Sequence, residues 1–507
     1  MLNLTAPGVY IEEVPSGVHT LTGVATSITA FVGRTALGPT DGGTTVTSFA
    51  EFVRQFGRLS RTYPLTYAVN DFFLNGGSTA VIVRLAHNAA TATFLVNDGA
   101  HQMNIDAASA GKWANGYKLH FAASTADDAA AVALGVADHT HLFDVQVIDT
   151  TTNPPAAVEV IRNVTIEDVP RRIDRALAQE SNFLRVRKPV PTPLPTVALG
   201  DLNHDGAGGD DGGTLDPGTL VADAQAILDH VDLFNLLVIP PDAWGTDTML
   251  AVAQAAAKYC VTRRAVLIAD PLFASKAATA VADITSYAVA GLDQRNVAAY
   301  FPMQLTRDPL DRKTIEQLPA GGAIAGAIAR TDAERGVWKA PAGLDVGLAT
   351  DGVSPPLTDA ENGTLNAAGI NCLRTFPNAG TVIWGARTLR GADNLSDDYK
   401  YLPVRRLALY LEESLFRGTK WVVFEPNAEP LWSQIRLNIG AFMQSLFRQG
   451  AFAGITPQQA YLVKCDAETT TADDVNRGIV NIIVGFAPLK PAEFVIIKIE
   501  QLAQSAG

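Results

Sequence analysis

Three segments of this 507-residue chain carry side chains whose types and spacing resemble a site for chemistry. The first, residues 201–206 (DLNHDG), matches the opening half of a calcium loop, D-x-N-x-D-G, in which oxygen ligands surround the ion. Gly212 stands at the twelfth position, where such a loop needs a bidentate carboxylate, although Asp210 and Asp211 are close by. The segment therefore favours a surface turn whose Asn, Asp and Gly residues supply the turn geometry.

The second segment, residues 329–341 (ARTDAERGVWKAP), concentrates charge. Its charged side chains could be drawn as a catalytic cluster of Asp332, Glu334, Arg335 and Lys339. No nucleophile or paired histidine accompanies them, so we expect a helix and turn with exposed charges and with Trp338 anchored in the core. The third segment, Gly321–Gly326, lacks the spacing and the lysine of a phosphate-binding loop and predicts a helix start.

Other catalytic and metal-binding motifs are absent from the sequence, which has no HExxH, no P-loop and no GxSxG. The eight histidines do not cluster at ligand spacing, and Cys260, Cys372 and Cys465 form no CxxC pair. We therefore expect a protein that is not an enzyme, with no catalytic residue, cofactor or bound metal. The three cysteines are expected to be reduced, buried thiols.

The composition, 47% hydrophobic and 18% charged, predicts a folded protein of about two to four domains. A formal net charge of -13 argues against nucleic-acid binding, because phosphate contacts need a basic surface. The first residues lack the basic flank and apolar run of a signal peptide. No run approaches the roughly 20 apolar residues that span a bilayer, so we expect no membrane insertion.

Apolar strands alternate with helices in two separate parts of the chain, which predicts an α/β domain with a parallel sheet covered on both faces. The strands are expected at 28–33, 80–85, 233–239 and 265–269. The helices are expected at 48–56, 65–74, 216–228 and 249–259. Between the two parts, short alternating segments rich in Ala, Thr and Asp predict a mostly β insertion at 86–194.

The last part of the chain predicts two amphipathic helices, at 404–416 and 431–447. Strands are expected after them at 460–464, 480–486 and 494–499. Residues 3–17 read as a further extended arm, with β-forming residues between Pro–Gly and Pro–Ser–Gly turns. A strand at a chain end must pair to satisfy its backbone groups, so extended segments at both ends indicate strand addition to neighbouring molecules.

Several of these segments, taken in order, resemble the contractile tail sheath family. The N-terminal half offers APGVYIEE at 6–13, TAFVG at 29–33, FFLNGG at 72–77, VIVR at 81–84 and GKWANG at 111–116, where Ala114 replaces the usual glycine. The C-terminal half offers DAERGVWKAP at 332–341, GIN at 369–371, GARTL at 385–389, Arg405-Arg406, FEPN at 424–427 and APLKPAEFVI at 487–496.

The resemblance implies an α/β, overall α+β, protein of discontinuous domains. The N-terminal arm would be 1–20, the α/β middle domain 21–85 and 195–369, and the mostly β outer insertion 86–194. A C-terminal α/β mesh domain at 370–490 would face an inner tube, followed by a C-terminal arm strand at 491–507. Sheath subunits of this kind stack as hexameric rings around the tube and contract to drive it through a target cell envelope.

The resemblance also implies site residues and partners. Arm strands between subunits would use Val9, Tyr10, Ile11, Glu12, Glu13, Val14, Phe494, Val495, Ile496, Ile497 and Ile499. Hinges would lie at Pro15, Gly17, Pro488 and Pro491. A polar, N-capped helix makes Asp473, Asp474 and Arg477 the candidates for contact with the tube. The expected partners are further copies of the chain, an inner tube protein, and baseplate and terminator or cap proteins, in a particle assembled in the bacterial cytoplasm.

Two alternatives come from other classes of protein. An α/β enzyme with a doubly wound domain would require titratable groups in a deep pocket at the carboxyl ends of the strands. Another particle component, such as a tube or capsid protein, would not need the two long helices near the C-terminus. Within the family, a phage, a tailocin and another contractile injection system fit the sequence equally well.

Overall fold

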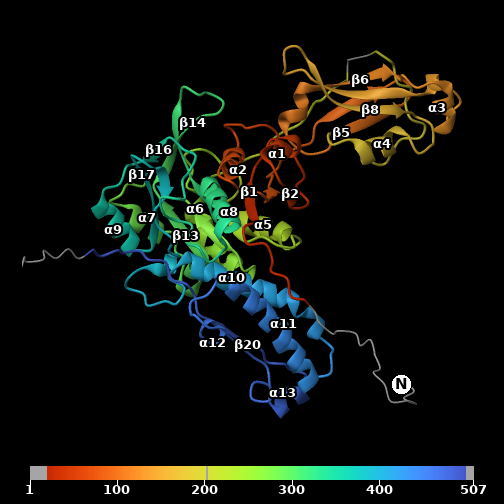
Figure 1. Cartoon of the computed structure of the whole chain (residues 1–507). Coiled ribbons are helices and arrows are strands. Elements are labelled where there is room, and N and C mark those ends of the chain that lie inside the picture. Colours follow the sequence, from red (N-terminus) through yellow and green to blue (C-terminus); the bar gives the residue numbers. More distant parts are fainter. Residues whose placement is uncertain (1–19, 201–203, 498–507) are drawn as a thin grey trace, which may run out of the picture. The chain divides into compact units, whose positions relative to one another are not determined.

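The computed structural model describes residues 20–200 and 204–497. The chain divides into two compact units. Unit 1 contains Met1–Thr26, Thr331–Pro341 and Ser396–Gly507, and unit 2 contains Ser27–Arg330 and Ala342–Leu395. Each unit is thus built from segments that are far apart in the sequence (Figure 1).

Unit 2 is built on an eight-stranded sheet with the order β18-β17-β13-β12-β11-β1-β3-β2. The six strands from β17 to β3 are parallel, and β18 and β2 are antiparallel edge strands. Their bounds are β1 Thr29–Gly33, β2 Thr44–Val46, β3 Ala80–Arg84, β11 Leu236–Val238, β12 Val266–Ala269, β13 Val297–Phe301, β17 Ile370–Phe376 and β18 Gly380–Ile383. The predicted covered parallel sheet is therefore present.

Helices cover both faces of this sheet. On one face, apolar residues of four helices share a core with the strands: α5 Leu220–Leu228, α6 Thr248–Thr262, α7 Ala280–Thr285 and α9 Asp359–Ala367. On the other face, the ring of Phe31 in β1 lies 5.4 Å from the ring of Phe72 in α2 (Pro64–Leu74). Helix α8 (Gly321–Arg335) approaches α2 closely, because a Cβ placed on Gly322 would lie 2.0 Å from the Ala68 carbonyl oxygen.

Smaller elements complete this part of unit 2. Helix α1 (Phe49–Phe56) begins at Ser48, whose side chain accepts a hydrogen bond from the Glu51 amide. A three-stranded antiparallel sheet has the order β15-β14-β16, with β14 Met303–Arg307, β15 Ile315–Leu318 and β16 Gly352–Ser354. The carboxylate of Asp308 fixes the β14–β15 hairpin by accepting hydrogen bonds from Arg61 and Tyr67.

The insertion has a hydrophobic core of its own within unit 2. Two antiparallel sheets, β4-β5-β9 and β10-β6-β7-β8, enclose this core. The elements are β4 Thr93–Asn97, β5 Gln102–Ala107, β6 Tyr117–Ala123, α3 Asp128–Ala133, β7 Phe143–Asp149, β8 Ala156–Val164, α4 Ile173–Glu180, β9 Leu184–Val186 and β10 His204–Asp205. The insertion extends beyond the predicted residue 194, because β10 pairs with β6 and Gly213 pairs with His87.

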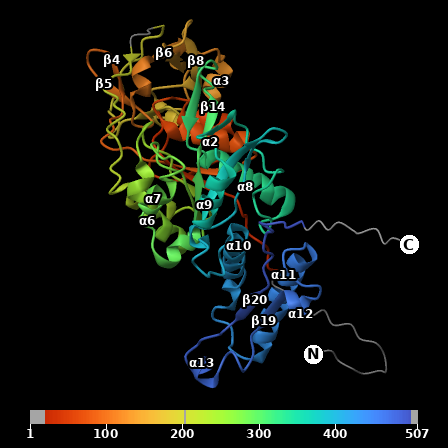
Figure 2. The same cartoon turned by 90° about the vertical axis from the view of Figure 1, so that its left-hand side faces the viewer.

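Unit 1 consists of two long helices and a small sheet. Helices α10 (Leu402–Gly418) and α11 (Glu429–Arg448) each begin with proline in the first turn, where its missing N–H costs nothing. Their apolar faces form one core with Leu21 and Val337. The remaining elements are α12 Pro457–Ala460, β19 Tyr461–Lys464, α13 Ala472–Asn476 and β20 Ile483–Phe486. In Figure 2, β19 and β20 lie beside α11.

The boundary between the two units lies at Leu395–Ser396 and not at the predicted residue 370. Strand β17 starts at Ile370 and pairs with β13, so residues 370–395 belong to the central sheet of unit 2. In the opposite sense, Thr331–Pro341 belongs to unit 1 because Val337 is buried in the core of its helices. Sequence periodicity could not predict either assignment, because both depend on pairing between distant segments.

Candidate assembly surface

The two-stranded sheet of unit 1, which we call the open sheet, consists of β19 and β20 paired antiparallel with Leu462 opposite Gly485. Its inner face packs Val463 and Val484 onto the helical core. Leu462 and Ile483 on the outer face are 55% and 50% exposed. An isolated two-stranded sheet is only marginally stable and needs further strands or a packed helix.

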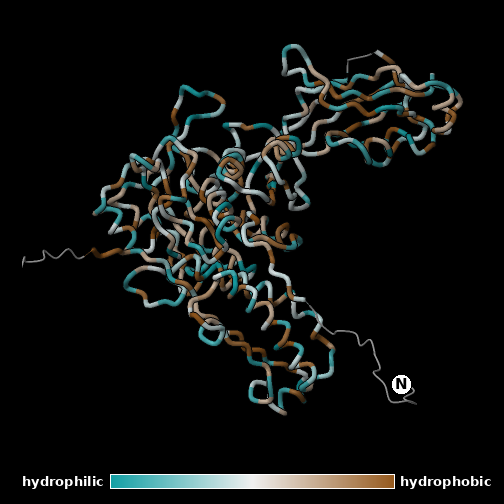
Figure 3. The backbone as a smooth tube through the Cα atoms, viewed as in Figure 1, coloured by the Kyte–Doolittle hydropathy of each residue, from teal (hydrophilic) through white to brown (hydrophobic). Residues whose placement is uncertain are grey.

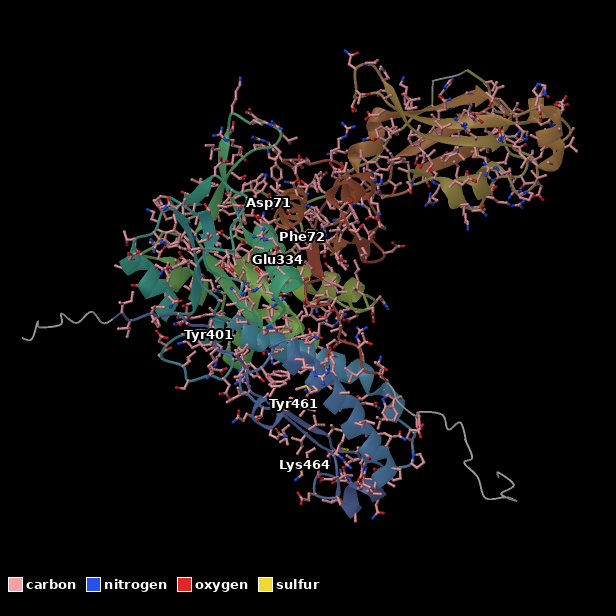
Figure 4. All side chains as sticks on the ribbon, in the orientation of Figure 1. Asp71, Phe72, Glu334, Tyr401, Tyr461 and Lys464 are labelled. Carbon is pink, nitrogen blue, oxygen red and sulfur yellow. The ribbon has the colours of Figure 1, made fainter. Side chains whose placement is uncertain are left out.

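Neither outer edge of the open sheet is joined to another strand among residues 20–200 and 204–497. Just beyond β20, Pro488 makes an antiparallel bridge to Phe452, a residue of the loop between α11 and α12. Unpaired strand edges present a row of N–H and C=O groups that other chains can pair with. In Figure 4, Tyr461 and Lys464 mark the two ends of β19.

Residues 487–497, which we call the C-terminal segment, leave the open sheet directly. Pro488 lies in the bridge to Phe452, and the Tyr401 hydroxyl lies 3.3 Å from the Glu493 carboxylate. The four apolar residues that end the described chain are between 75% and 83% exposed: Phe494, Val495, Ile496 and Ile497. They form the brown stretch next to the C-terminal grey trace in Figure 3.

The predicted strand at 494–499 is not formed over its described residues, 494–497. The reason is that a strand needs a paired partner, and none lies beside these residues within the described chain. The other predicted arm residues, Val9–Val14 and Ile499, lie outside the described residues, as do the hinge candidates Pro15 and Gly17. Pro491 is described and lies outside any helix or strand.

The three candidates for tube contact lie on or next to the short helix α13. The carboxylate of Asp474 closes a capping box by accepting hydrogen bonds from the Thr471 amide and hydroxyl at 3.0 and 2.8 Å. These bonds lower the pKa of Asp474. Asp473 and Arg477 form an exposed ion pair at 3.5 Å. Asp474 therefore holds the helix, whereas Asp473 and Arg477 present charge to the solvent.

An exposed apolar loop between α10 and α11 was not predicted. Val423 is 63% exposed, and Phe424 is fully exposed with a φ of 72°, a left-handed conformation that is rare for a bulky residue. The loop is ordered by Asn427, which donates to the Ile479 carbonyl oxygen and accepts from the Trp432 indole. Only the FEPN segment marked this place in the sequence, and residue type alone does not reveal exposure.

The charged segment at 329–341 differs from its prediction in one respect. Asp332 is not exposed but forms an ion pair of 2.5 Å with Arg406, and both side chains are 3% exposed. Glu334 is exposed on α8, as predicted (Figure 4). Val337 and Trp338 contribute to the core of unit 1, and Trp338 is half-buried there.

The calcium-like segment also has a structural role. Asp205 pairs with Lys118, and Asp210 pairs with Lys112. Among the described residues, no group of three or more His, Cys, Asp or Glu side chains gathers in a way that could hold a metal ion. Gly206 and Gly209 allow close backbone approach, because a Cβ on them would lie 2.0 Å from the Ala114 carbonyl oxygen and 2.3 Å from the Gly111 carbonyl oxygen.

The central sheet does bring two buried carboxyls to a cavity near the carboxyl ends of its strands, where a doubly wound enzyme would hold its substrate. Burial raises the pKa of Asp71 and of Asp270 to about 7. The cavity is only about 10 Å³, room for one water molecule. Asp71 accepts a hydrogen bond from Gln304, and Asp270 accepts from the Gly321 amide at the start of α8. Asp71 thus links α2 to β14, and Asp270 caps the start of α8.

Comparison with known proteins agrees with the mixed α/β architecture and the separate helical unit. The family described as the phage tail sheath protein central domain matches residues 220–389, and the phage tail sheath C-terminal domain matches residues 395–501. A prophage major tail sheath protein of Pseudomonas aeruginosa (strain UCBPP-PA14) is 27% identical over 280 residues, which are 53% of this chain and 66% of the relative. The tail sheath protein of Enterobacteria phage T4 is 27% identical over 162 residues, 32% of this chain and 23% of that protein.

Solved structures share the fold over nearly the whole chain. The sheath complex of the extracellular contractile injection system PVC, in its contracted state, gives a TM-score of 0.60 at 21% identity, covering 99% of both chains. The sheath tail protein of Desulfitobacterium hafniense gives a TM-score of 0.60 at 14% identity, covering 95% of this chain and all of that one. The two family matches, together with this shared fold, define the class as tail sheath proteins.

The chain belongs to the tail sheath protein family of phages and contractile injection systems. It is a structural sheath subunit rather than an enzyme. The chain spans 66% and 23% of the lengths of the two curated relatives that it matches. Among the described residues, no helix has the length and apolar character needed to cross a membrane.

Proposed function

We propose that this sheath subunit polymerises as stacked hexameric rings around an inner tube and contracts to drive the tube through a target cell envelope. The open sheet carries the proposal. Neither of its edges pairs with another strand of the described chain, and it lies in the same unit as a C-terminal segment whose last four described residues are apolar and exposed. Each edge would accept one terminal segment of a neighbouring subunit by strand addition.

The energy of such a link is adequate for a repeating mesh. A donated strand of about four to six residues would form as many backbone hydrogen bonds, at roughly 1 kcal/mol net each. Leu462 and Ile483 on the outer face would lose exposed apolar surface when the sheet widens. Residues 9–14 and 494–499 would be the donated strands, and Pro15, Gly17, Pro488 and Pro491 would flank them as hinges.

The test is assembly of the purified full chain, observed by negative-stain electron microscopy. We expect hollow tubes with six-fold end views. A variant that lacks residues 1–17 and a second variant, Phe494→Asp with Ile496→Asp, should give no tubes. The first removes one donated strand, and the second places two charges where the other strand would bury apolar side chains. Val261→Asp, which changes a partly exposed apolar residue of α6, is the control and should assemble. Discrete particles from the unchanged chain would contradict the proposal.

We further propose that Asp473 and Arg477, with Asp474 holding their helix, face the tube. Their charges are exposed, so a matching charged surface on the tube protein could pair with them. Exchanging the two charges (Asp473→Arg with Arg477→Asp) keeps opposite charges at positions 473 and 477. We expect this variant to form empty sheaths normally but to assemble around tubes less readily, which co-sedimentation with tube protein would measure. Unchanged co-sedimentation would reject this surface.

A further inference from the structure

The first described residues of unit 1 lie along helix α10. Leu21 lies against Gly418 at the end of the helix, and Thr26 contacts Arg406 near its start. From Arg406 to Gly418 the helix covers about 18 Å at about 1.5 Å per residue. The five steps from Leu21 to Thr26 cover about 17 Å when extended. Residues 21–26, which we call the strap, therefore run antiparallel to α10 in an extended conformation.

Two glycines fit the strap to the helix. A Cβ on Gly23 would lie 1.9 Å from the Tyr410 hydroxyl oxygen, so only glycine leaves room for that side chain. A Cβ on Gly418 would lie 2.5 Å from Cγ of Leu21, which is buried in the core of unit 1. Between them, the Val24 amide donates a hydrogen bond of 3.2 Å to the buried Ser414 hydroxyl.

The strap ends in a buried polar cluster, which we call the anchor cluster: Thr26, Asp332 and Arg406. The Thr26 hydroxyl donates to the Asp332 carboxylate at 2.7 Å. The Arg406 guanidinium donates to both carboxylate oxygens of Asp332, at 2.8 and 2.5 Å, and to the Thr26 carbonyl oxygen at 2.9 Å. Because the ion pair is bidentate and buried, breaking it would leave a charge without a partner in the protein interior.

We propose that the strap and the anchor cluster form a mechanical anchor that keeps the N-terminal segment attached to unit 1 when neighbouring subunits pull on it. The inference rests on the proposed function, in which residues 9–14 pair with another subunit. The strap follows those residues in the chain, so tension on them reaches Leu21 first. The anchor cluster is the last contact to open, and its buried charges resist opening most strongly.

The test is to pull single full-length molecules between the N-terminus and a handle on unit 1. The three native cysteines are buried, so Gln449→Cys gives one addressable exposed site. We expect a distinct release event of about 20 Å before the units unfold, which corresponds to freeing the strap. Thr26→Val removes the hydroxyl without changing its shape, and Ser414→Ala removes the acceptor for Val24. The two changes together should make release at a given force about tenfold faster.

A matched control changes the hydroxyl of Thr419, the residue that caps the C-terminal end of α10, because this hydroxyl bonds back to the helix. Thr419→Val removes a bond from Thr419 to the Leu415 carbonyl oxygen and should leave the release rate unchanged. Gly23→Ala should speed release, and adding Tyr410→Phe should recover part of the loss by removing the colliding hydroxyl. The rate of hydrogen exchange of residues 20–27 should be higher in the variants that release faster and unchanged in Thr419→Val.

Two outcomes would overturn the anchor: a release rate that the strap variants leave unchanged, or the same acceleration in Thr419→Val. Both are measured on single molecules and require no polymer. Failure of the unchanged chain to form tubes would instead contradict the proposed function, so the two ideas fail separately. If tubes do form, the strap variants should assemble but break into short pieces on contraction.

Discussion

The carboxyl of Asp71 is buried and accepts a hydrogen bond of 2.6 Å from the Gln304 amide, and burial raises its pKa to about 7. Its pKa in the unfolded chain is close to the ordinary value of 3.8. Between these values the folded chain holds one more proton than the unfolded chain. The free energy of unfolding therefore falls as the pH rises through this window and levels off above it.

Asp71→Asn removes this titration while keeping an oxygen for Gln304. The free energy of unfolding of the unchanged chain should decrease between about pH 5 and pH 8. In the variant we expect this decrease to be smaller by about 2 kcal/mol. Denaturant titrations at the two pH values measure this difference. The exposed Asp41→Asn is the control, and an equal pH dependence in the Asp71 variant would disprove the assignment.

Gly209 has no side chain, and this allows the backbone at Gly111 to pack closely against it. A Cβ there would lie 2.3 Å from the Gly111 carbonyl oxygen, so Gly209→Ala must push two backbone segments apart at the root of the insertion. We expect a loss of stability of about 1–3 kcal/mol, typical of overpacking. Gly42→Ala, with no atom within 4 Å of its Cβ, is the matched control. Thermal unfolding of both variants tests the difference, and equal melting temperatures would contradict it.

At the scale of elements, two histidine–carboxylate pairs lie on the module formed by α3 and the short helix His139–His141. Its core consists of three buried residues, Ala131, Val136 and Leu142. The carboxylate of Asp128 raises the pKa of His139, and that of Glu167 raises the pKa of His141. Both pairs are stabilising while the histidines are protonated, and this contribution is lost as the pH rises through the raised pKa values.

We therefore expect hydrogen exchange of residues 126–142, corrected for its intrinsic pH dependence, to accelerate as the pH rises past the raised pKa values of the two histidines, which lie above the ordinary 6.5. His139→Gln with His141→Gln should exchange quickly at every pH and show no such step. His120→Gln, on β6 of the same insertion, should behave like the unchanged chain. A step that persists in the double variant would show that other groups hold the module.

The sequence predicted elements whose residues carry their own periodicity. Helices expected at 404–416 and 431–447 are α10 and α11, and the apolar runs at 28–33 and 265–269 contain β1 and β12. Pairing between distant segments was harder to predict, because local periodicity does not indicate which segments become partners. The exposed Phe424 and the buried Asp332 were missed for the same reason, since exposure is decided by the surrounding chain.

At the scale of the whole molecule, the insertion is an independent core placed within one connection of the central sheet. Its entry and exit lie side by side, because His87 pairs with Gly213 and Ala90 pairs with Asp210. Its apolar core is separate from that of the central sheet. A domain with its own core and neighbouring ends can be removed or added with little effect on its host.

Replacing residues 89–211 with a short Gly–Ser linker should therefore leave a folded sheath subunit. The foreseeable losses are hydrogen bonds across the junction: the Arg84 guanidinium donates to the Ala110 carbonyl oxygen, the Gly38 amide to the Ser109 hydroxyl and the Tyr63 hydroxyl to the Asp211 carboxylate. Arg84 keeps its bonds to the carbonyl oxygens of Thr35 and Gly38. We expect a cooperative thermal transition and tubes that match those of the unchanged chain except for a thinner outer layer. Residues 88–212 expressed alone should fold as well. A shortened chain that aggregates, beside an insertion that folds alone, would instead show that the insertion stabilises the central sheet.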